Sequence, residues 1–208
     1  MRCAISMRMM RIAYPSGSEE LRSALGQDWA RLIASFPSVT LVPALNMGSS
    51  VSVFLDELDV SAIILSGGED IGLFPARDET EYAMVEYALA RRLPVLGVCR
   101  GAQLLNRHFG GADAPVFGHV ATRHEARFIP GILPGLDEMP LEVNSYHRRA
   151  INVLGDNLLP VAISSDASTE AFRHEFLPVW GVMWHPEREE TLGAHDRIIL
   201  SELFKDRL

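Results

Sequence analysis

The chain has 208 residues, of which 48% are hydrophobic, and a formal net charge of −8. This length favours a single α/β domain with a sizeable core, and the acidic balance argues against nucleic acid or an anionic membrane surface as the main partner. The sequence has no apolar run long enough for a transmembrane helix and no secretory signal pattern. Because it has two cysteines, Cys3 and Cys99, and no disulfide framework is indicated, we expect a reducing, cytoplasmic location.

The first half of the chain predicts strands that alternate with helices. We expect residues 1–9 to be a flexible extension before one domain that spans residues 10–208. Short apolar runs predict strands at 10–15, 39–42, 62–66 and 93–98. Helical spacing predicts helices at 19–36, 50–58 and 78–92, with Asp78 as the N-cap of the third. This alternation predicts a doubly wound, mostly parallel sheet flanked by helices, with ligands at the carboxyl ends of its strands.

The half of the chain after Gly110 has a different pattern. Short runs separated by turns predict antiparallel strands at 141–144, 150–153, 161–163, 169–173 and 179–183. A last helix is expected at 190–204. The predicted fold class is therefore α/β, a mostly parallel sheet with a small antiparallel subsheet.

The run Gly97-Val98-Cys99-Arg100-Gly101 follows an apolar strand and precedes a predicted helix. A strand that passes into a helix through one residue flanked by glycines is typical of a nucleophile elbow, a tight turn whose neighbouring positions must lack side chains. Amide N–H groups at the helix N-terminus favour a thiolate at the cysteine and can hold a developing oxyanion. A buried cysteine at the end of a core strand is the alternative interpretation.

The run Trp184-His185-Pro186-Glu187 provides a candidate base for this thiol. A thiolate that attacks an acyl carbon requires a base, and the base must be oriented. In extended backbone His185 and Glu187 point the same way, so Glu187 can hold one imidazole nitrogen while the other faces Cys99. Taken alone, this spacing more often means a surface histidine beside a glutamate.

Four linked motifs are shared with a known family: Ser66-Gly67-Gly68-Glu69-Asp70, Gly97-Val98-Cys99-Arg100-Gly101-Ala102-Gln103, Asn144-Ser145-Tyr146-His147 and Trp184-His185-Pro186-Glu187. Their order resembles that of class I glutamine amidotransferases, and the resemblance extends from Met10 to the C-terminus. The set is most similar to the γ-glutamyl hydrolase branch, which is peptidase C26-like. The resemblance implies a flavodoxin-like fold and cysteine-dependent hydrolysis of a γ-glutamyl amide bond.

The resemblance also implies a role for each motif. Cys99 would attack the γ-carbonyl and form a γ-glutamyl thioester, with His185 as the base and Glu187 as its orienting carboxylate. The backbone N–H groups of Gly68 and Arg100 would form the oxyanion hole, with the Arg100 side chain merely solvated. Residues that would bind the glutamyl group are Gly67, Gln103, Asn144, Ser145, Tyr146 and His147. For this last strand, and for His147 in particular, a structural role is the alternative.

Two further residues, His119 and Glu170, match recurring positions of the family. A structural role is favoured for His119, and Glu170 lies either near the site or on a surface strand. No grouping of cysteine and histidine has the spacing of a zinc site, and Gly67-Gly68 does not make a phosphate loop. We therefore predict neither a metal ion nor a cofactor.

The short loop between Asp70 and the segment 77–81 distinguishes the chain from longer γ-glutamyl hydrolases. With Gly118-His119-Val120, this loop resembles that of the γ-glutamyl-CDP-amidate hydrolases of surface-polysaccharide phosphoramidate synthesis. The leaving group would then be cytidine diphosphoramidate. Candidates to contact its diphosphate are Arg77, Arg123 and Arg148.

Three functions are compatible with these motifs. The first is a free-standing γ-glutamyl hydrolase with a small-molecule substrate, as a monomer or a homodimer. The second is a glutaminase subunit that delivers ammonia to a separate synthase partner. The third is a non-catalytic binding or regulatory protein, against which the intact Cys99, His185 and Glu187 argue.

Overall fold

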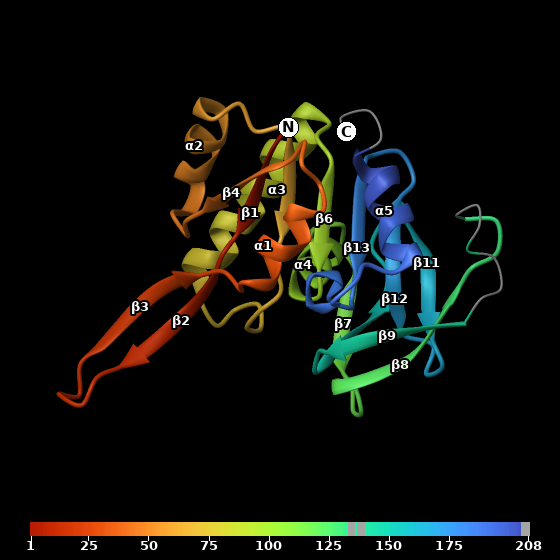
Figure 1. Ribbon diagram of the computed structural model, residues 1–208. Coiled ribbons are helices and arrows are strands. Elements are labelled where there is room, and N and C mark those ends of the chain that lie inside the picture. The colour runs from red at the N-terminus through yellow and green to blue at the C-terminus, as the bar shows by residue number, and fades with distance from the viewer. Residues whose placement is uncertain (133–135, 137–139, 205–208) are drawn as a thin grey trace.

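A large mixed sheet runs through the protein in the computed structural model, which describes residues 1–132, 136 and 140–204 (Figure 1). The core of the sheet has the strand order β4-β1-β5-β6-β13. These strands are Thr40–Ala44 (β4), Arg2–Ser6 (β1), Ala62–Leu65 (β5), Val95–Val98 (β6) and Val179–Val182 (β13). Each neighbouring pair in this core is parallel, which confirms the predicted parallel sheet.

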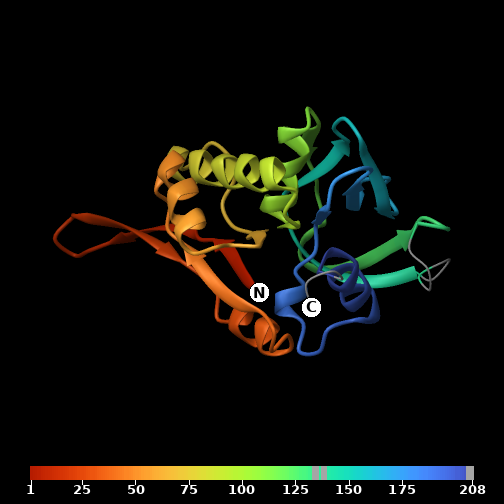
Figure 2. The ribbon, with the colours of Figure 1, turned by 90° about the horizontal axis from the view of Figure 1, so that it is seen from above.

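Helices cover both faces of this core, as predicted for a doubly wound sheet (Figure 2). One face carries α1 (Asp28–Ala34) and α5 (Ala194–Phe204), and the other carries α2 (Val51–Glu57), α3 (Pro75–Arg91) and α4 (Arg100–His108). Side chains of β1 alternate between the faces: Cys3 and Ile5 share a hydrophobic cluster with Trp29, whereas Ala4 shares the opposite cluster with Leu55. The core strands are apolar because both of their faces are covered.

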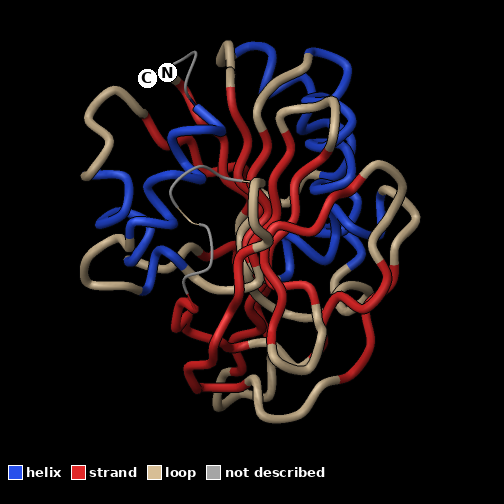
Figure 3. The backbone as a smooth tube through the Cα atoms, turned by 90° about the vertical axis from the view of Figure 1, so that its right-hand side faces the viewer, coloured by secondary structure: helices blue, strands red, loops and turns tan. Residues whose placement is uncertain are grey.

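The sheet continues through antiparallel strands from the second half of the chain. Figure 3 shows the strands running through the middle of the molecule, with helices on two sides of them. From β13 the order is β12-β11-β8-β9, and β10 pairs with β12 and β7. Their bounds are Thr169–His174 (β12), Leu158–Ser164 (β11), Val120–Phe128 (β8), Pro140–Tyr146 (β9), Arg149–Val153 (β10) and Ala112–Pro115 (β7). The predicted strand at 179–183 is present as β13, but it is parallel to β6 as well as antiparallel to β12, so it joins the two halves.

The predicted flexible extension at residues 1–9 is wrong. Residues 2–6 form β1, which lies between β4 and β5, and its residues from Cys3 to Ser6 are fully buried. The apolar run Cys3-Ala4-Ile5 is short and is flanked by polar residues, so its own sequence does not distinguish a buried strand from a frayed end. Pairing with two distant strands decides its structure.

The predicted strand at 10–15 is present as part of β2 (Arg8–Ala13), but outside the parallel sheet, and the predicted helix at 19–36 is wrong over its first part. Strands β2 and β3 (Glu19–Ala24) form a separate two-stranded antiparallel sheet that projects from the domain (Figure 1). Leu21, at a position of the predicted helical stripe, is 53% exposed on β3. Only the end of the predicted stripe lies in a helix, where α1 buries Trp29. Pairing of β3 with β2 therefore decides the structure of this segment, although the spacing of its apolar residues favours a helix.

Helix α3 begins at Pro75, and Asp78 does not cap it. Proline suits the first helical position because its missing N–H would have no partner there. The Asp78 carboxylate instead accepts a hydrogen bond from the Gly72 N–H at 2.8 Å and pairs with Arg100. Helices α2 and α5 lie within the ranges predicted for them. Within the described residues, no helix combines the length and apolarity needed to cross a membrane.

Candidate active site

Strand β6 and helix α4 meet at Cys99, in the tight turn that the sequence predicts. Cys99 has φ 52° and ψ −105°, and a positive φ is uncommon for a residue other than glycine. A Cβ atom at Gly97 would lie 2.6 Å from the backbone of Gly101, and one at Gly101 would lie 2.1 Å from the carbonyl oxygen of Leu65. Glycine is therefore required at both positions. The turn has the geometry of a nucleophile elbow, and its strain is of the kind that concentrates at functional sites.

His185 and Glu187 follow β13, the strand beside β6, so the parallel pairing brings them to the edge of the sheet that carries Cys99. His185 Nδ1 lies 2.7 Å from Glu187 Oε1, and both side chains are buried. Burial lowers the pKa of His185, but hydrogen bonding and charge interactions with Cys99 and Glu187 outweigh it and raise the pKa to about 9. The structure thus brings together the three residues that were predicted as a catalytic set.

Asn144 and Ser145 form hydrogen bonds with backbone groups at this edge of the sheet. Asn144 Oδ1 accepts a hydrogen bond from the His185 N–H at 2.9 Å, and Asn144 Nδ2 donates to the His185 carbonyl at 2.9 Å and to Glu189 at 2.6 Å. The fully buried Ser145 donates from Oγ to the His119 carbonyl at 2.7 Å. These side chains have protein partners and position this edge, and their predicted contact with a glutamyl group stays a prediction.

A cavity of about 470 Å³ opens beside the elbow, a volume that suits a small molecule. Predicted residues in its wall are Gly68, Cys99, Arg100, Gln103, Tyr146 and His147. Gly67 instead borders a smaller cavity of about 90 Å³, together with Gly68, His185 and Glu187. Gln103 donates from Nε2 to the Arg149 carbonyl at 2.8 Å. The site residues therefore surround two adjoining cavities that share Gly68.

Besides the ion-paired Arg100, two arginines line the larger cavity: Arg148, which was predicted, and Arg8, which was not. The lining also includes Glu69 and Asp70, and Arg8 Nε lies 3.7 Å from Glu69 Oε2. Arg8 lies at the start of β2, within the segment that the sequence analysis assigned to an extension. Arg123 lies outside this lining and pairs with Glu189 at 2.8 Å and Glu142 at 3.4 Å. Among the three predicted diphosphate candidates, Arg148 is the one that lines the cavity.

Arg77, the remaining diphosphate candidate, is fully buried, and its guanidinium group contacts other groups of the protein. It pairs with Glu69 at 2.8 Å and Glu81 at 3.0 Å, and it donates to the carbonyl oxygens of Ser66 and Gly67 at 2.9 and 3.1 Å. Its predicted contact with a ligand is therefore wrong. Its contacts fix the loop that follows β5.

The Arg100 side chain is also buried, at 2% exposure, and pairs with Asp78 and Glu81. The prediction of a solvated side chain is wrong, because α4 turns this side chain toward α3. The backbone of Arg100 remains at the N-terminus of α4, next to Cys99. This ion-pair network holds the start of α4 against α3 and so supports the elbow.

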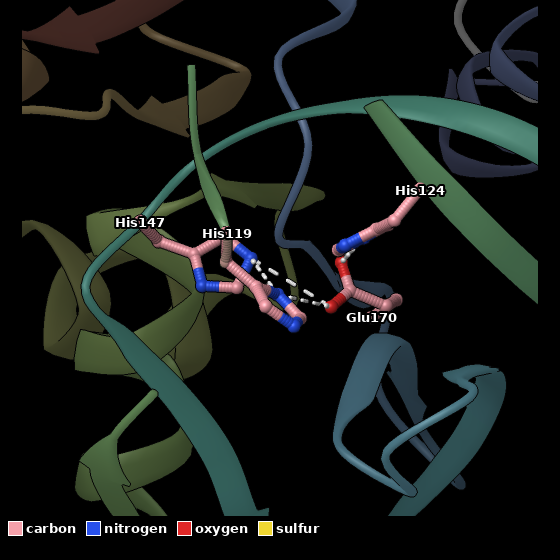
Figure 4. Close-up of side chains that lie close together, drawn as sticks. All are labelled: His119, His124, His147 and Glu170. Atoms are coloured by element: carbon pink, nitrogen blue, oxygen red, sulfur yellow. Dashed lines mark hydrogen bonds and ion pairs between the residues drawn. The ribbon is translucent and has the colours of Figure 1, made fainter. Parts of the chain in front are cut away.

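The side chains of His119, His124, His147 and Glu170 lie close together (Figure 4), and His147 also lines the larger cavity. One ligand atom from each lies within 4.8 Å of the others. Glu170 is fully buried, so its predicted surface alternative is wrong. Sequence analysis missed His124 and the grouping itself, because zinc-type spacing along the chain does not register side chains brought together from separate strands.

Comparisons with known proteins agree with this geometry. A family model described as Peptidase C26 matches residues 4–187. The gamma-glutamyl-CDP-amidate hydrolase of Campylobacter jejuni is 31% identical over 193 residues, which cover 89% of this chain and 90% of that protein. One component of the glutamine-hydrolysing GMP synthase of Methanococcoides burtonii is 35% identical over 145 residues, 69% of this chain and 72% of that protein. The crystal structure of a glutamine amidotransferase from Thermotoga maritima has a similar fold, with a TM-score of 0.64, 17% identity, and coverage of 100% of this chain and 83% of that one.

Proposed function

The chain belongs to the peptidase C26 family of glutamine amidotransferase-like hydrolases, and from this premise we propose that it hydrolyses a γ-glutamyl amide bond through a thioester on Cys99. The observation that carries the proposal is the meeting of a strained cysteine elbow with a buried His185–Glu187 pair, whose Nδ1 and Oε1 atoms lie 2.7 Å apart. A nucleophile, a base and an orienting carboxylate are the three parts that acyl transfer requires.

In the acylation step, the Cys99 sulfur attacks the γ-carbonyl carbon as a thiolate, with the proton held on His185. The carbonyl oxygen becomes an oxyanion, which the backbone N–H groups of Gly68 and Arg100 stabilise. The C–N bond then breaks, and the proton on His185 passes to the leaving nitrogen. The raised pKa of His185, about 9, supports an imidazolium beside the thiol at neutral pH.

In the deacylation step, water attacks the thioester carbon. His185, oriented by Glu187, takes a proton from this water, and the C–S bond breaks. Glutamate leaves, and the proton restores the Cys99–His185 pair. One water molecule is consumed in each cycle, and Asn144 keeps the His185 backbone in place through both steps.

We propose γ-glutamyl-CDP-amidate as the substrate, with glutamate and cytidine diphosphoramidate as products, in the synthesis of phosphoramidate groups for a capsule or other surface polysaccharide. Similarity to the Campylobacter jejuni hydrolase over nearly the whole length of both chains supports this substrate. The cavity lining supports it as well, because Arg8 and Arg148 add guanidinium groups, which bind phosphate oxygens well.

A glutaminase that supplies ammonia to a separate synthase is the second candidate. The observation that favours it is the 35% identity to the glutamine-hydrolysing GMP synthase component of Methanococcoides burtonii. In this case glutamine would occupy the same cavity, and its turnover would depend on a partner protein. The chemistry at Cys99 would be unchanged.

The test is a substrate panel of γ-glutamyl-CDP-amidate, γ-glutamyl-amines and glutamine, with glutamate and nucleotide products measured by chromatography and mass spectrometry. We expect kcat/KM for γ-glutamyl-CDP-amidate to exceed that for glutamine by at least ~100-fold, because only the former offers a diphosphate to the arginines. Glutamine turnover that appears only with a synthase present would favour the second candidate.

Two cysteine variants control this assay. Cys99→Ala should lose turnover of every substrate, whereas Cys3→Ala, which alters the buried cysteine of β1, should retain it. Turnover that survives Cys99→Ala would overturn the proposal for both candidates.

A further inference from the structure

We propose that His119, His124, His147 and Glu170, here called the histidine cluster, bind one divalent transition-metal ion, for which Zn²⁺ is the best fit (Figure 4). His119 directly precedes β8 and His147 directly follows β9, whereas His124 lies on β8 and Glu170 on β12. Imidazole nitrogen and carboxylate oxygen are ligands that Zn²⁺ accepts in protein sites. The inference does not depend on which amide the enzyme hydrolyses.

Three atoms of the cluster form a nearly equilateral triangle. His119 Nδ1 lies 3.5 Å from His147 Nε2 and 3.7 Å from Glu170 Oε1, and His147 Nε2 lies 3.6 Å from Glu170 Oε1. An ion at the centre of this triangle is ~2.1 Å from each atom, which is the range of Zn–N and Zn–O bonds. His124 Nε2 lies 3.3 Å from the other oxygen of Glu170 and is placed to be the fourth ligand.

Hydrogen bonds on the outer side of the rings decide which atoms face the centre. His147 Nδ1 lies 3.0 Å from the Arg149 carbonyl oxygen, which can only accept, so Nδ1 carries the hydrogen and Nε2 turns a lone pair inward. His119 Nε2 lies 3.1 Å from Asp166 Oδ2, so His119 Nδ1 likewise turns a lone pair inward. Histidines that bind metals usually make such outer contacts with a carboxylate or a backbone carbonyl.

These tautomers bring lone pairs of two imidazoles and a carboxylate to one point without a hydrogen atom between them. Such a group of acceptors repels itself in the absence of a cation and is stabilised by one. His124 Nε2 lies 3.3 Å from Glu170 Oε2 and pairs with it when the ring is protonated, whereas His124 Nδ1 and Glu170 Oε1 have no hydrogen-bond partner among the described residues. Because buried polar groups are nearly always satisfied, the atoms that remain without a partner in this cluster point to a bound cation.

The position of the cluster indicates what the ion does. His147 lines the substrate cavity next to Tyr146, and Glu170 belongs to β12, the neighbour of β13. An ion bound here ties β8 and β9 to β12 and holds the cavity wall at a fixed distance from the strand that leads to His185. Four protein ligands close the coordination shell, so the ion positions the wall and takes no part in the reaction.

The test is metal binding by the full chain. Zn²⁺ affinity is measured by competition with a chromophoric chelator, stoichiometry by elemental analysis, and geometry by the absorption spectrum of Co²⁺-loaded protein. The Cys99→Ala variant is measured in parallel, because the Cys99–His185 pair is a second place where Zn²⁺ can bind. We expect one ion per chain in both proteins and a tetrahedral Co²⁺ spectrum without a thiolate band.

Substitutions should weaken binding in a graded way. Glu170→Gln removes the central carboxylate and should weaken Zn²⁺ binding by at least ~100-fold, whereas Asp166→Asn alters an outer contact and should weaken it by ~10–100-fold. His108→Ala, which alters a histidine at the end of α4 outside the cluster, should leave the affinity unchanged.

Two results would overturn the proposal. One is wild-type protein that binds Zn²⁺ and Co²⁺ no more tightly than Glu170→Gln does. The other is stoichiometric binding that disappears in Cys99→Ala and persists in Glu170→Gln, which would place the ion at the thiol. Stoichiometry and the Co²⁺ spectrum are measured on the wild type, so these two measurements test the proposal even if a variant fails to fold.

Discussion

Two glutamates, Glu81 and Glu170, are both fully buried, and each contacts a residue that lines the larger cavity, yet their partners differ in kind. Glu81 lies between Arg77 and Arg100, which carry a permanent charge and offer only hydrogen-bond donors. Glu170 faces the three imidazoles of the histidine cluster, which can be neutral and then offer lone pairs.

The contrast shows that a buried carboxylate can be surrounded by two different kinds of partner in this fold. The arginines neutralise Glu81 with groups of the protein itself, so the charge of this carboxylate is balanced without a ligand. The imidazoles around Glu170 can be neutral and turn lone pairs toward it, so in our proposal a cation completes the histidine cluster. We therefore expect the first network to set the intrinsic stability of the protein and the second to make stability depend on metal.

The largest effect is expected where the complete network is broken. Glu81→Gln leaves two buried guanidinium groups without their shared carboxylate, so it should lower the free energy of unfolding by ~3–5 kcal/mol. Urea unfolding followed by circular dichroism measures this. The matched control is Glu86→Gln on the exposed side of α3, which should change stability by less than ~0.5 kcal/mol. Equal effects of the two substitutions would contradict the role of the network.

His185 is a third case, a buried imidazole that its partners keep protonated. Its pKa is raised from 6.5 to about 9, which corresponds to about 3 kcal/mol of stabilisation. Because the folded-state pKa is raised, this contribution is complete below pH ~6.5 and is lost as the pH rises through ~9. NMR titration of the His185 ring should show the raised pKa in the wild type and a lower one in Cys99→Ala, with His108 as the internal reference. A wild-type titration near 6.5 would show that the pairing is absent.

Zn²⁺ should change the free energy of unfolding differently in variants of the two glutamates. At free Zn²⁺ of 100 times the dissociation constant, the free energy of unfolding should rise by ~2.7 kcal/mol, because the ion binds the folded state. Glu170→Gln should lose this response, and Glu81→Gln should keep it. Urea unfolding with and without Zn²⁺, in the Cys99→Ala background, measures the difference. A response that is lost in Glu81→Gln alone would reverse the assignment.

The smallest effect is expected at the cavity wall, where Arg148 is exposed. Arg148→Ala should raise KM for γ-glutamyl-CDP-amidate by ~10-fold with a smaller change in kcat, because the arginine binds a part of the substrate that does not react. Arg148→Lys should recover part of the loss. Arg123→Ala is the control, since Arg123 pairs with Glu189 outside the cavity lining. A fall in kcat larger than the rise in KM would place Arg148 nearer to the reacting bond.

Sequence alone predicted the parts of the fold whose cause is local. The elbow was predictable because Gly97 and Gly101 are required by close backbone contacts, and β5 and β6 were predictable as short, apolar, β-branched runs. Strands β1 and β3 were missed because their structure depends on partners elsewhere in the chain. A five-residue run cannot show that two distant strands will flank it.

The site divides in the same way. Cys99, His185 and Glu187 carry a recognisable spacing, and the structure brings them together. The partners of Arg77 and Asn144 depend on tertiary packing, so the sequence did not show the burial of Arg77 or the hydrogen bonds from Asn144 to His185. The histidine cluster is assembled from side chains on separate strands, a juxtaposition to which no single motif corresponds.

The most direct test of Cys99 as the nucleophile is to trap the acyl-enzyme. Wild-type protein is mixed with γ-glutamyl-CDP-amidate, quenched in acid within the first turnover, and analysed by mass spectrometry of the intact chain and its peptides. We expect the mass of one γ-glutamyl group on the peptide that contains Cys99, and no such adduct in Cys99→Ala. Product formation at the wild-type rate by Cys99→Ala, or an adduct on a different residue, would contradict a thioester at Cys99.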